Sequence, residues 1–179
     1  MIYFVRHGES EANAADVLAG SQIDSPMTEK GRAQVGQAIE YIKQHGIKID
    51  HIVSSPMIRT RETAEMIAQA IGINPKSITY DPRLIEHDCG SLTGHSTQVS
   101  SVELVTAPGA ESSEALLRRV QAALRDIMKF DGNTLIASHA GVGRMIIAKH
   151  RGMDLQHYND VAGITNGAVV ELDLTGVIT

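Results

Sequence analysis

Three segments of this sequence place chemically capable side chains directly after short apolar runs, where strands of a sheet would end. They are Arg6-His7-Gly8, Ser54-Ser55-Pro56 leading to Arg59, and Ser138-His139-Ala140-Gly141. Each segment alone is typical of a surface turn. Together they supply arginine side chains, whose planar forks of N–H donors match phosphate oxygens, and helix starts with free backbone N–H groups. The three segments therefore predict a phosphate-binding pocket.

The two histidines in these segments have different expected uses. Nearby arginines disfavour a further positive charge, so His7 should stay neutral near pH 7 and keep a nitrogen lone pair for attack on phosphorus. His139 could donate a hydrogen bond to the phosphoryl group and stabilise the charge on its oxygens during transfer. The alternative for His139 is a buried histidine at the edge of the sheet.

Expulsion of an alkoxide from a phosphate ester also needs an acid, and Glu86 is the first candidate. It lies where an extended segment passes into a long loop. Glu9, close to His7 in the chain, ranks second. The alternative for both residues is an ordinary solvated carboxylate.

No metal ion or other cofactor is expected, because side chains already supply positive charge to the pocket. Four potential metal ligands occur in one stretch: His87, Asp88, Cys89 and His95. Their spacing matches no established ligand pattern, so we expect them to be ordinary loop residues.

Predicted strands and helices alternate along the chain. The predicted strands are residues 2–5, 51–54, 78–80, 134–138 and 168–174, and the predicted helices are about 28–45, 55–71, 112–130 and 142–150. Such an alternation indicates an α/β fold with a mostly parallel sheet and helices on both faces. Ligands bind such sheets beyond the carboxyl ends of the strands, where the three polar segments occur. Residues 87–110 form an unusually long loop with room for a short helix, which suggests a lid.

Length and composition limit the class of protein. The chain of 179 residues suits a single domain, with 42% hydrophobic and 21% charged residues. A net charge of −5 and an aromatic content of 3% argue against a nucleic-acid partner. One cysteine excludes an internal disulfide, and no window approaches the ~18 apolar residues of a membrane span. The first apolar run is too short for a signal peptide, so we expect a cytoplasmic protein without membrane contact.

The motifs resemble those of the histidine phosphatase superfamily, in its phosphoglycerate-mutase-like branch. The residues that carry the resemblance follow in order: Arg6-His7-Gly8-Glu9 with Asn13, Ser25-Pro26-Met27-Thr28 to Gly31 and Gln34, Ser54-Ser55-Pro56 with Arg59 and Thr63-Ala64, Glu86, Pro108-Gly109 with Glu111-Ser112, and Ser138-His139-Ala140-Gly141. Each motif alone is weak, but their joint order covers nearly the whole chain.

The resemblance implies a three-layer α/β sandwich in which His7 becomes a phosphohistidine. It places Arg6, Arg59, His139 and Asn13 around the phosphoryl group and makes Glu86 the acid that protonates the leaving oxygen. Ser21, Gln22 and Ala140 fall where relatives contact the substrate.

The lid segment departs from the phosphoglycerate mutases that the chain resembles. Residues 87–110 contain no Arg, no Lys and no aromatic residue, whereas the mutases use such residues to hold a second charged group. Hydrolysis is therefore favoured over phosphate transfer. We expect a metal-independent phosphomonoesterase, monomeric or homodimeric, acting on a small phosphorylated metabolite or a phosphoprotein. The alternatives are a mutase and a non-catalytic protein that binds phosphorylated ligands.

Overall fold

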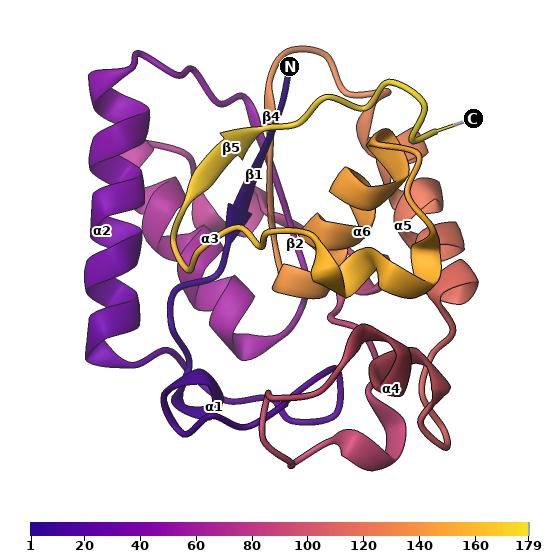
Figure 1. Cartoon of the computed structure of the whole chain (residues 1–179). Coiled ribbons are helices and arrows are strands. Elements are labelled where there is room, and N and C mark those ends of the chain that lie inside the picture. Colours follow the sequence, from indigo (N-terminus) through magenta and orange to yellow (C-terminus); the bar gives the residue numbers. More distant parts are fainter. Residues whose placement is uncertain (179) are drawn as a thin grey trace.

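The computed structural model describes residues 1–178 and places their five strands in one sheet, in the order β3-β2-β4-β1-β5 (Figure 1). The strands are β1 (Ile2–Arg6), β2 (His51–Ser54), β3 (Thr79–Tyr80), β4 (Thr134–Ser138) and β5 (Val169–Glu171). The first four run parallel, and β5 pairs antiparallel with β1. The predicted α/β fold with a mostly parallel sheet is confirmed.

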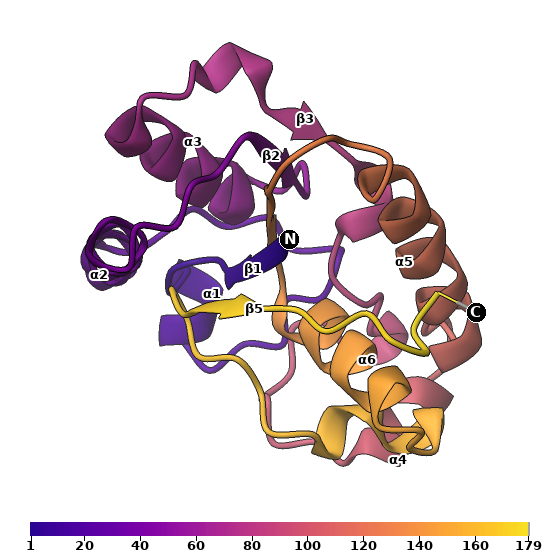
Figure 2. The same ribbon diagram turned by 90° about the horizontal axis from the view of Figure 1, so that it is seen from above.

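Helices cover both faces of the sheet, as Figure 2 shows from above. α2 (Glu29–Gln44) and α3 (Ile58–Ile71) lie on one face, whereas α5 (Ser113–Ile127) and α6 (Ala140–His150) lie on the other. The three layers expected from the sequence are therefore present. Among residues 1–178, no helix combines the length and apolar character that crossing a membrane requires.

Strand β1, which lies between β4 and β5, explains why a continuous apolar run forms an interior strand of the sheet. Successive side chains of a strand point to opposite faces. Tyr3 and Val5 belong to the apolar cluster that contains α2 and α3, whereas Phe4 belongs to the cluster that contains α5 and α6. A strand that is covered on both faces needs apolar residues at every position, because each side chain enters a core.

Some element boundaries differ from the sequence prediction. α3 begins at Ile58, after Pro56, and α6 begins at Ala140, two residues before the predicted start. The last strand is only three residues long. A short helix, α1 (Glu11–Ala14), was not predicted, because four residues show no helical periodicity. Its signal is Ser10, which exchanges backbone and side-chain hydrogen bonds with Asn13 in a capping box.

The loop from residue 87 to residue 110 contains the expected short helix, α4 (Ser101–Thr106). Ser100 accepts a hydrogen bond from the backbone N–H of Glu103, whose carboxylate accepts in return from the backbone N–H of Ser100. This capping box stabilises a helix that is too short to persist on its own.

The three polar segments meet at one edge of the sheet. Arg6 lies opposite Ser138 in the register of β1 and β4, and Ser54 lies opposite Ala137 in the register of β2 and β4. The hydrogen bonds continue beyond the strands, from His7 N to the Ser138 carbonyl at 3.1 Å. Parallel pairing of β1, β2 and β4 therefore brings residues from three distant parts of the chain to one place.

Candidate active site

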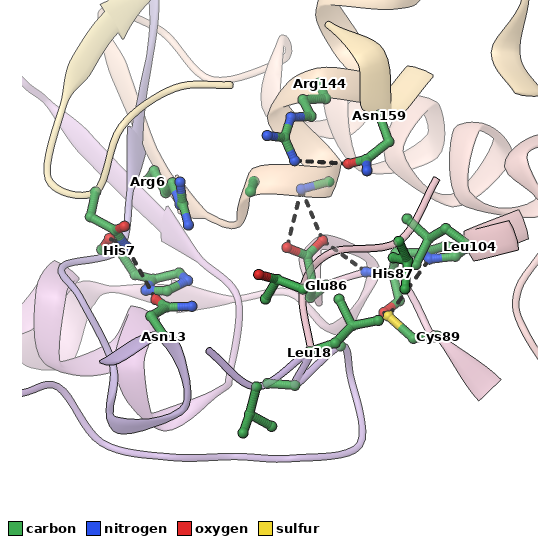
Figure 3. Close-up of a pocket in the computed structure, with 18 of the residues that line it drawn as sticks. Arg6, His7, Asn13, Leu18, Glu86, His87, Cys89, Leu104, Arg144 and Asn159 are labelled. Atoms are coloured by element: carbon green, nitrogen blue, oxygen red, sulfur yellow. Dashed lines mark hydrogen bonds between the residues drawn. The ribbon is translucent and has the colours of Figure 1, made fainter. Parts of the chain in front are cut away.

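A cavity of about 450 Å³ opens beyond the carboxyl ends of these strands (Figure 3). Six of the residues predicted from the sequence line it: Arg6, His7, Asn13, Arg59, Glu86 and Ala140. His139 does not line the cavity. It is fully buried, and its ring centroid lies 5.2 Å from that of His7. The fold thus gathers the predicted phosphate-binding residues around one imidazole.

The backbone fixes the proton position on His7. Its Nδ1 lies 2.7 Å from the Gly8 carbonyl oxygen, which can only accept, so Nδ1 carries the proton and donates. The Nε2 atom therefore keeps its lone pair. Burial, followed by the charges of Arg59 and Arg6, holds the pKa of His7 well below its usual range. At neutral pH His7 is an uncharged imidazole with a nucleophilic nitrogen.

Gly8 is required by close packing and not by a special backbone angle. It is absent from the glycines with positive φ among residues 1–178. A Cβ added at Gly8 would lie 2.3 Å from the backbone oxygen of Gly31, at the start of α2. The absence of a side chain at Gly8 therefore lets α2 approach the segment that carries His7.

The arginines donate most of their hydrogen bonds to loop carbonyls. Arg6 Nη1 donates to Ile164 O at 3.0 Å, and Arg59 Nη2 donates to Gly20 O at 3.0 Å. Asp24 lies 3.8 Å from Arg59, whereas Arg6 has no carboxylate partner within the described chain. Burial lowers the pKa of both guanidinium groups, but from so high a value that both stay cationic at neutral pH.

Two buried nitrogen atoms beside His7 have no hydrogen-bond partner among residues 1–178. They are Arg6 Nε and His139 Nδ1. The other ring nitrogen of His139 lies 2.8 Å from Ser55 Oγ. Burial, with the charge of Arg59 in addition, holds the pKa of His139 well below its usual range, so this ring is neutral. Buried polar atoms are normally paired, so these two nitrogens lack the hydrogen-bond partner that such atoms usually have.

Glu86 is directed by the first turn of α6. Both of its carboxylate oxygens accept from Gly141 N at 3.1 Å, and Oε1 also accepts from His87 N at 2.9 Å (Figure 3). A Cβ at Gly141 would lie 2.4 Å from Glu86 Oε1, so glycine allows this contact. The carboxylate is thereby held at the cavity wall, where it can exchange a proton with a bound ester.

A half-buried ion pair holds the segment that carries Glu86. Arg119 of α5 pairs with Glu111 through a 2.7 Å contact. Its terminal nitrogens also donate to the carbonyls of Arg83, Ile85 and Glu86 at 2.7–3.0 Å. This set of bonds fixes the backbone of residues 83–86 relative to α5.

Of the other residues predicted for the site, some lie at the cavity and some do not. Asn13 Oδ1 accepts from Asn166 Nδ2 at 3.3 Å at the cavity wall. Ser21 and Gln22 are not brought to the cavity, and Gln22 instead donates to Asp88 on the surface. Glu9 reaches the edge of the cavity, but its carboxylate is bound by Lys30 and Thr28.

Two other kinds of reactive group can be assessed within residues 1–178, the thiol of Cys89 and clusters of metal ligands. Cys89 lines the cavity, but burial raises its pKa to about 12, so it stays a poorly nucleophilic thiol. Groups of three or more His, Cys, Asp or Glu residues placed to hold a metal ion are absent from this part of the chain.

Sequence reasoning missed one cation of the cavity, Arg144. It lines the wall together with Asn159 and Tyr158, which come from the segment Leu155–Asp160. The helical spacing contained the signal, because Arg144 lies four residues after Ala140 and so shares its face of α6. The argument that a second charged group would find no cation considered only the lid, and the structure corrects it.

The lid segment is attached to the loop after α1. Leu18 N donates to His95 O at 2.8 Å, and Gly94 N donates to Leu18 O at 3.0 Å. The hydroxyls of Ser96 and Thr97 both donate to the carboxylate of Asp16. Thr97, Val99 and Leu104 then form part of the cavity wall.

Known proteins share this sequence pattern and fold. The family model described as histidine phosphatase superfamily (branch 1) matches residues 2–177. A protein of Enterobacter sp. (strain 638), named probable phosphoglycerate mutase GpmB, is 40% identical over 153 residues, which are 77% of this chain and 68% of that protein.

Solved structures show the same fold at lower identity. Bacillus stearothermophilus YhfR superposes with a TM-score of 0.82 at 24% identity, covering 96% of this chain and 91% of that chain. A mycobacterial glucosyl-3-phosphoglycerate phosphatase superposes with a TM-score of 0.76 at 19% identity, covering 94% of this chain and 90% of that chain.

Proposed function

The chain belongs to branch 1 of the histidine phosphatase superfamily, and from this premise we propose that it hydrolyses phosphomonoesters through a phosphohistidine on His7. The observation that carries the proposal is the state of His7. It is a neutral imidazole with a free Nε2 lone pair, next to Arg6 and the orphaned nitrogen of His139. Such a group is a nucleophile placed beside the donors that a phosphoryl group needs.

In the first step of the proposed reaction, His7 Nε2 attacks phosphorus and forms a P–N bond. The bond between phosphorus and the ester oxygen breaks, and its electron pair stays on that oxygen. Glu86, in its protonated form, transfers a proton to the departing oxygen, so the alcohol leaves neutral. Arg6 and Arg59 balance the charge of the phosphoryl oxygens.

In the second step, water attacks phosphorus while Glu86 removes its proton. The P–N bond breaks, and its electron pair returns to Nε2 of His7. Inorganic phosphate is released, and both residues recover their starting protonation states. Because arginine side chains carry the positive charge, we propose that no metal ion takes part. The cavity of about 450 Å³ favours a small ester as substrate.

The names of relatives support two reactions. One similar structure is named a phosphatase, whereas the Enterobacter relative is named a probable mutase. We favour hydrolysis, because a second phosphate group would find one further cation, Arg144, in the described cavity wall, and residues 87–110 add no Arg or Lys to it. The presence of both His7 and Glu86 in the cavity argues against a protein that only binds phosphorylated ligands.

The first prediction is a trapped covalent adduct. Rapid mixing with a ³²P-labelled aryl phosphate, followed by an alkaline denaturing quench that preserves phosphohistidine, should label the native protein on His7. His7→Ala should show no label, and the surface control His45→Ala should be labelled like the native protein. Free phosphate should accumulate with time. Label in His7→Ala would overturn the nucleophile. In a parallel assay with 3-phosphoglycerate and its bisphosphate, isomerised product without free phosphate would establish a mutase.

A further inference from the structure

Asn166 connects the segment before β5 to the segment that carries the nucleophile. Its side chain is half-buried and lines the cavity together with Asn13. Asn166 Nδ2 donates to His7 O at 2.9 Å and to Asn13 Oδ1 at 3.3 Å. One amide group therefore uses both of its N–H bonds on residues at the phosphoryl end of the cavity.

The hydrogen-bonding capacity of each partner decides which atoms face each other. The His7 carbonyl only accepts, so the part of Asn166 beside it must be the NH₂ group. That NH₂ group needs an acceptor, so Asn13 must turn its oxygen toward Asn166. The backbone N–H of Ser10 selects the same oxygen, because it donates to Asn13 Oδ1 at 3.2 Å. Two donors from distant parts of the chain thus hold the Asn13 amide in one of its two orientations.

The nitrogen of the Asn13 amide is left available to a ligand. Asn13 Nδ2 has no hydrogen-bond partner within residues 1–178, and it does not belong to the buried atoms that lack one, so a ligand can reach it. Asn13 lies beside His7 (Figure 3). In the opposite orientation, an oxygen atom would take the place of this nitrogen and repel an anionic phosphoryl oxygen.

We propose that Asn166 is a positioning residue, which turns the Asn13 amide so that its NH₂ group faces the phosphoryl group. This inference rests on the proposed function, which brings a phosphoryl group to His7. An N–H that donates to a charged oxygen makes one of the stronger hydrogen bonds in proteins. Asn13 makes this bond only when its oxygen is held on the other side, which is what Asn166 and Ser10 do together.

The alternative is that Asn166 acts only by holding the backbone of His7. This backbone has other bonds, because His7 N donates to Ser138 O at 3.1 Å and Gly8 N donates to Thr63 Oγ1 at 3.2 Å. Loss of the bond from Asn166 to the His7 carbonyl should therefore displace the nucleophile little. The effect of Asn166 should depend on its second partner, the amide of residue 13.

The test is a double-mutant cycle between Asn166→Ala and Asn13→Ala. The readouts are kcat/KM for 4-nitrophenyl phosphate and the affinity for inorganic phosphate, measured by calorimetry. Each single variant should lose about 10- to 100-fold in both, as expected for a hydrogen bond to a charged oxygen. The double variant should lose no more than about threefold beyond Asn13→Ala, because Asn166 then has no amide to orient. Thr165→Ala, at an exposed neighbour outside the cavity wall, is the matched control and should keep native values.

A second background separates orientation from the capping of α1. Asn13→Asp keeps an acceptor for the Ser10 N–H, but both ends of its side-chain group are oxygen atoms. A carboxylate has no amide orientation to fix, so Asn166→Ala should again cost no more than about threefold in this background. Urea unfolding of each variant checks that the fold is retained.

Losses that multiply in both double variants would show that Asn166 acts independently of Asn13 and would overturn the inference. Native values in Asn166→Ala would overturn it too, and either result with retained turnover leaves the phosphatase proposal standing. If the native protein hydrolyses no phosphate ester, the proposed function fails, and the cycle in phosphate affinity alone decides the role of Asn166. Absence of phosphate binding to the native protein would overturn that role as well.

Discussion

The two ends of the cavity are built in different ways. At the phosphoryl end, the residues are fixed by the sheet. His7 and His139 directly follow β1 and β4, and Arg59 lies in the first turn of α3. Each of these side chains is at most 2% exposed. At the substrate end, the lid around residues 94–98 is largely exposed and attached through a few hydrogen bonds to residues 16–18. The difference indicates that sheet register fixes the reacting groups, whereas loop contacts shape the space for the rest of the substrate.

Glu86 belongs to the reacting end, and its removal tests that assignment most strongly. Glu86→Gln should slow hydrolysis of alkyl phosphates by roughly 10²- to 10⁴-fold, because an alkoxide leaving group needs a proton. 4-Nitrophenyl phosphate, with a good leaving group, should be slowed far less. Steady-state kinetics on both substrates measures the difference. Glu9→Gln is the matched control, because Lys30 and Thr28 hold its carboxylate.

Equal slowing of both substrates by Glu86→Gln would remove Glu86 from the role of acid. The comparison of the two ends would then also change, because the carboxylate held by the first turn of α6 would have a positioning role. A large effect of Glu9→Gln restricted to alkyl phosphates would transfer the acid role to Glu9.

The buried histidines of the reacting end should make stability depend on pH. Their pKa values in the folded protein are lowered, so the unfolded chain binds protons more readily. This contribution to stability is therefore fully present above about pH 6.5 and is lost as the pH falls below it, by about 1.4 kcal/mol per pH unit for each neutral histidine. Urea unfolding between pH 7 and pH 5 measures the slope.

His139→Gln removes one of these titrating groups and should reduce the slope of stability against pH. The exposed control His45→Gln should keep the slope of the native protein. An unchanged slope in His139→Gln would mean that this imidazole already accepts a proton in the folded state. The contrast between a buried reacting end and an exposed substrate end would then be contradicted.

The smallest expected effect concerns the lid attachment at Asp16. Asp16→Ala removes the acceptor of the Ser96 and Thr97 hydroxyls, which costs about 1 kcal/mol for each hydrogen bond lost. We expect KM for ester substrates to rise by about 3- to 10-fold with a smaller change in kcat. Asp173→Ala, at an exposed carboxylate outside the cavity wall, is the control. A fall in kcat with unchanged KM would place Asp16 at the reacting end.

Much of the reacting end could be predicted from sequence, because its signals are local. Apolar runs that end in Arg6-His7-Gly8 or Ser138-His139-Ala140-Gly141 identify both a buried strand and the chemistry at its end. Once the sheet is parallel, these ends must meet. The ring nitrogen of His7 that carries the proton could not be predicted from the sequence, because it depends on the orientation of the ring toward the Gly8 carbonyl.

The substrate end could not be predicted in the same way. Ser21 and Gln22 were expected near the substrate but lie outside the cavity, whereas Arg144 and Asn159 line it without having been considered. Ser21 and Gln22 lie in a loop, where no periodicity fixes the direction of a side chain, whereas the helical spacing of α6 did hold the signal for Arg144. The positions of loop residues follow from contacts such as that between Leu18 and His95, which are distant in the chain.

The sequence by itself determined the layers of the fold, the family and the residue types that meet at the strand ends, because hydrophobic period and side-chain chemistry are properties of short segments. Only the tertiary structure decided that Gly141 binds Glu86, that Arg119 holds residues 83–86 and that α6 contributes a third cavity arginine. These contacts join residues far apart in the chain, and packing of helices against the sheet sets their distances.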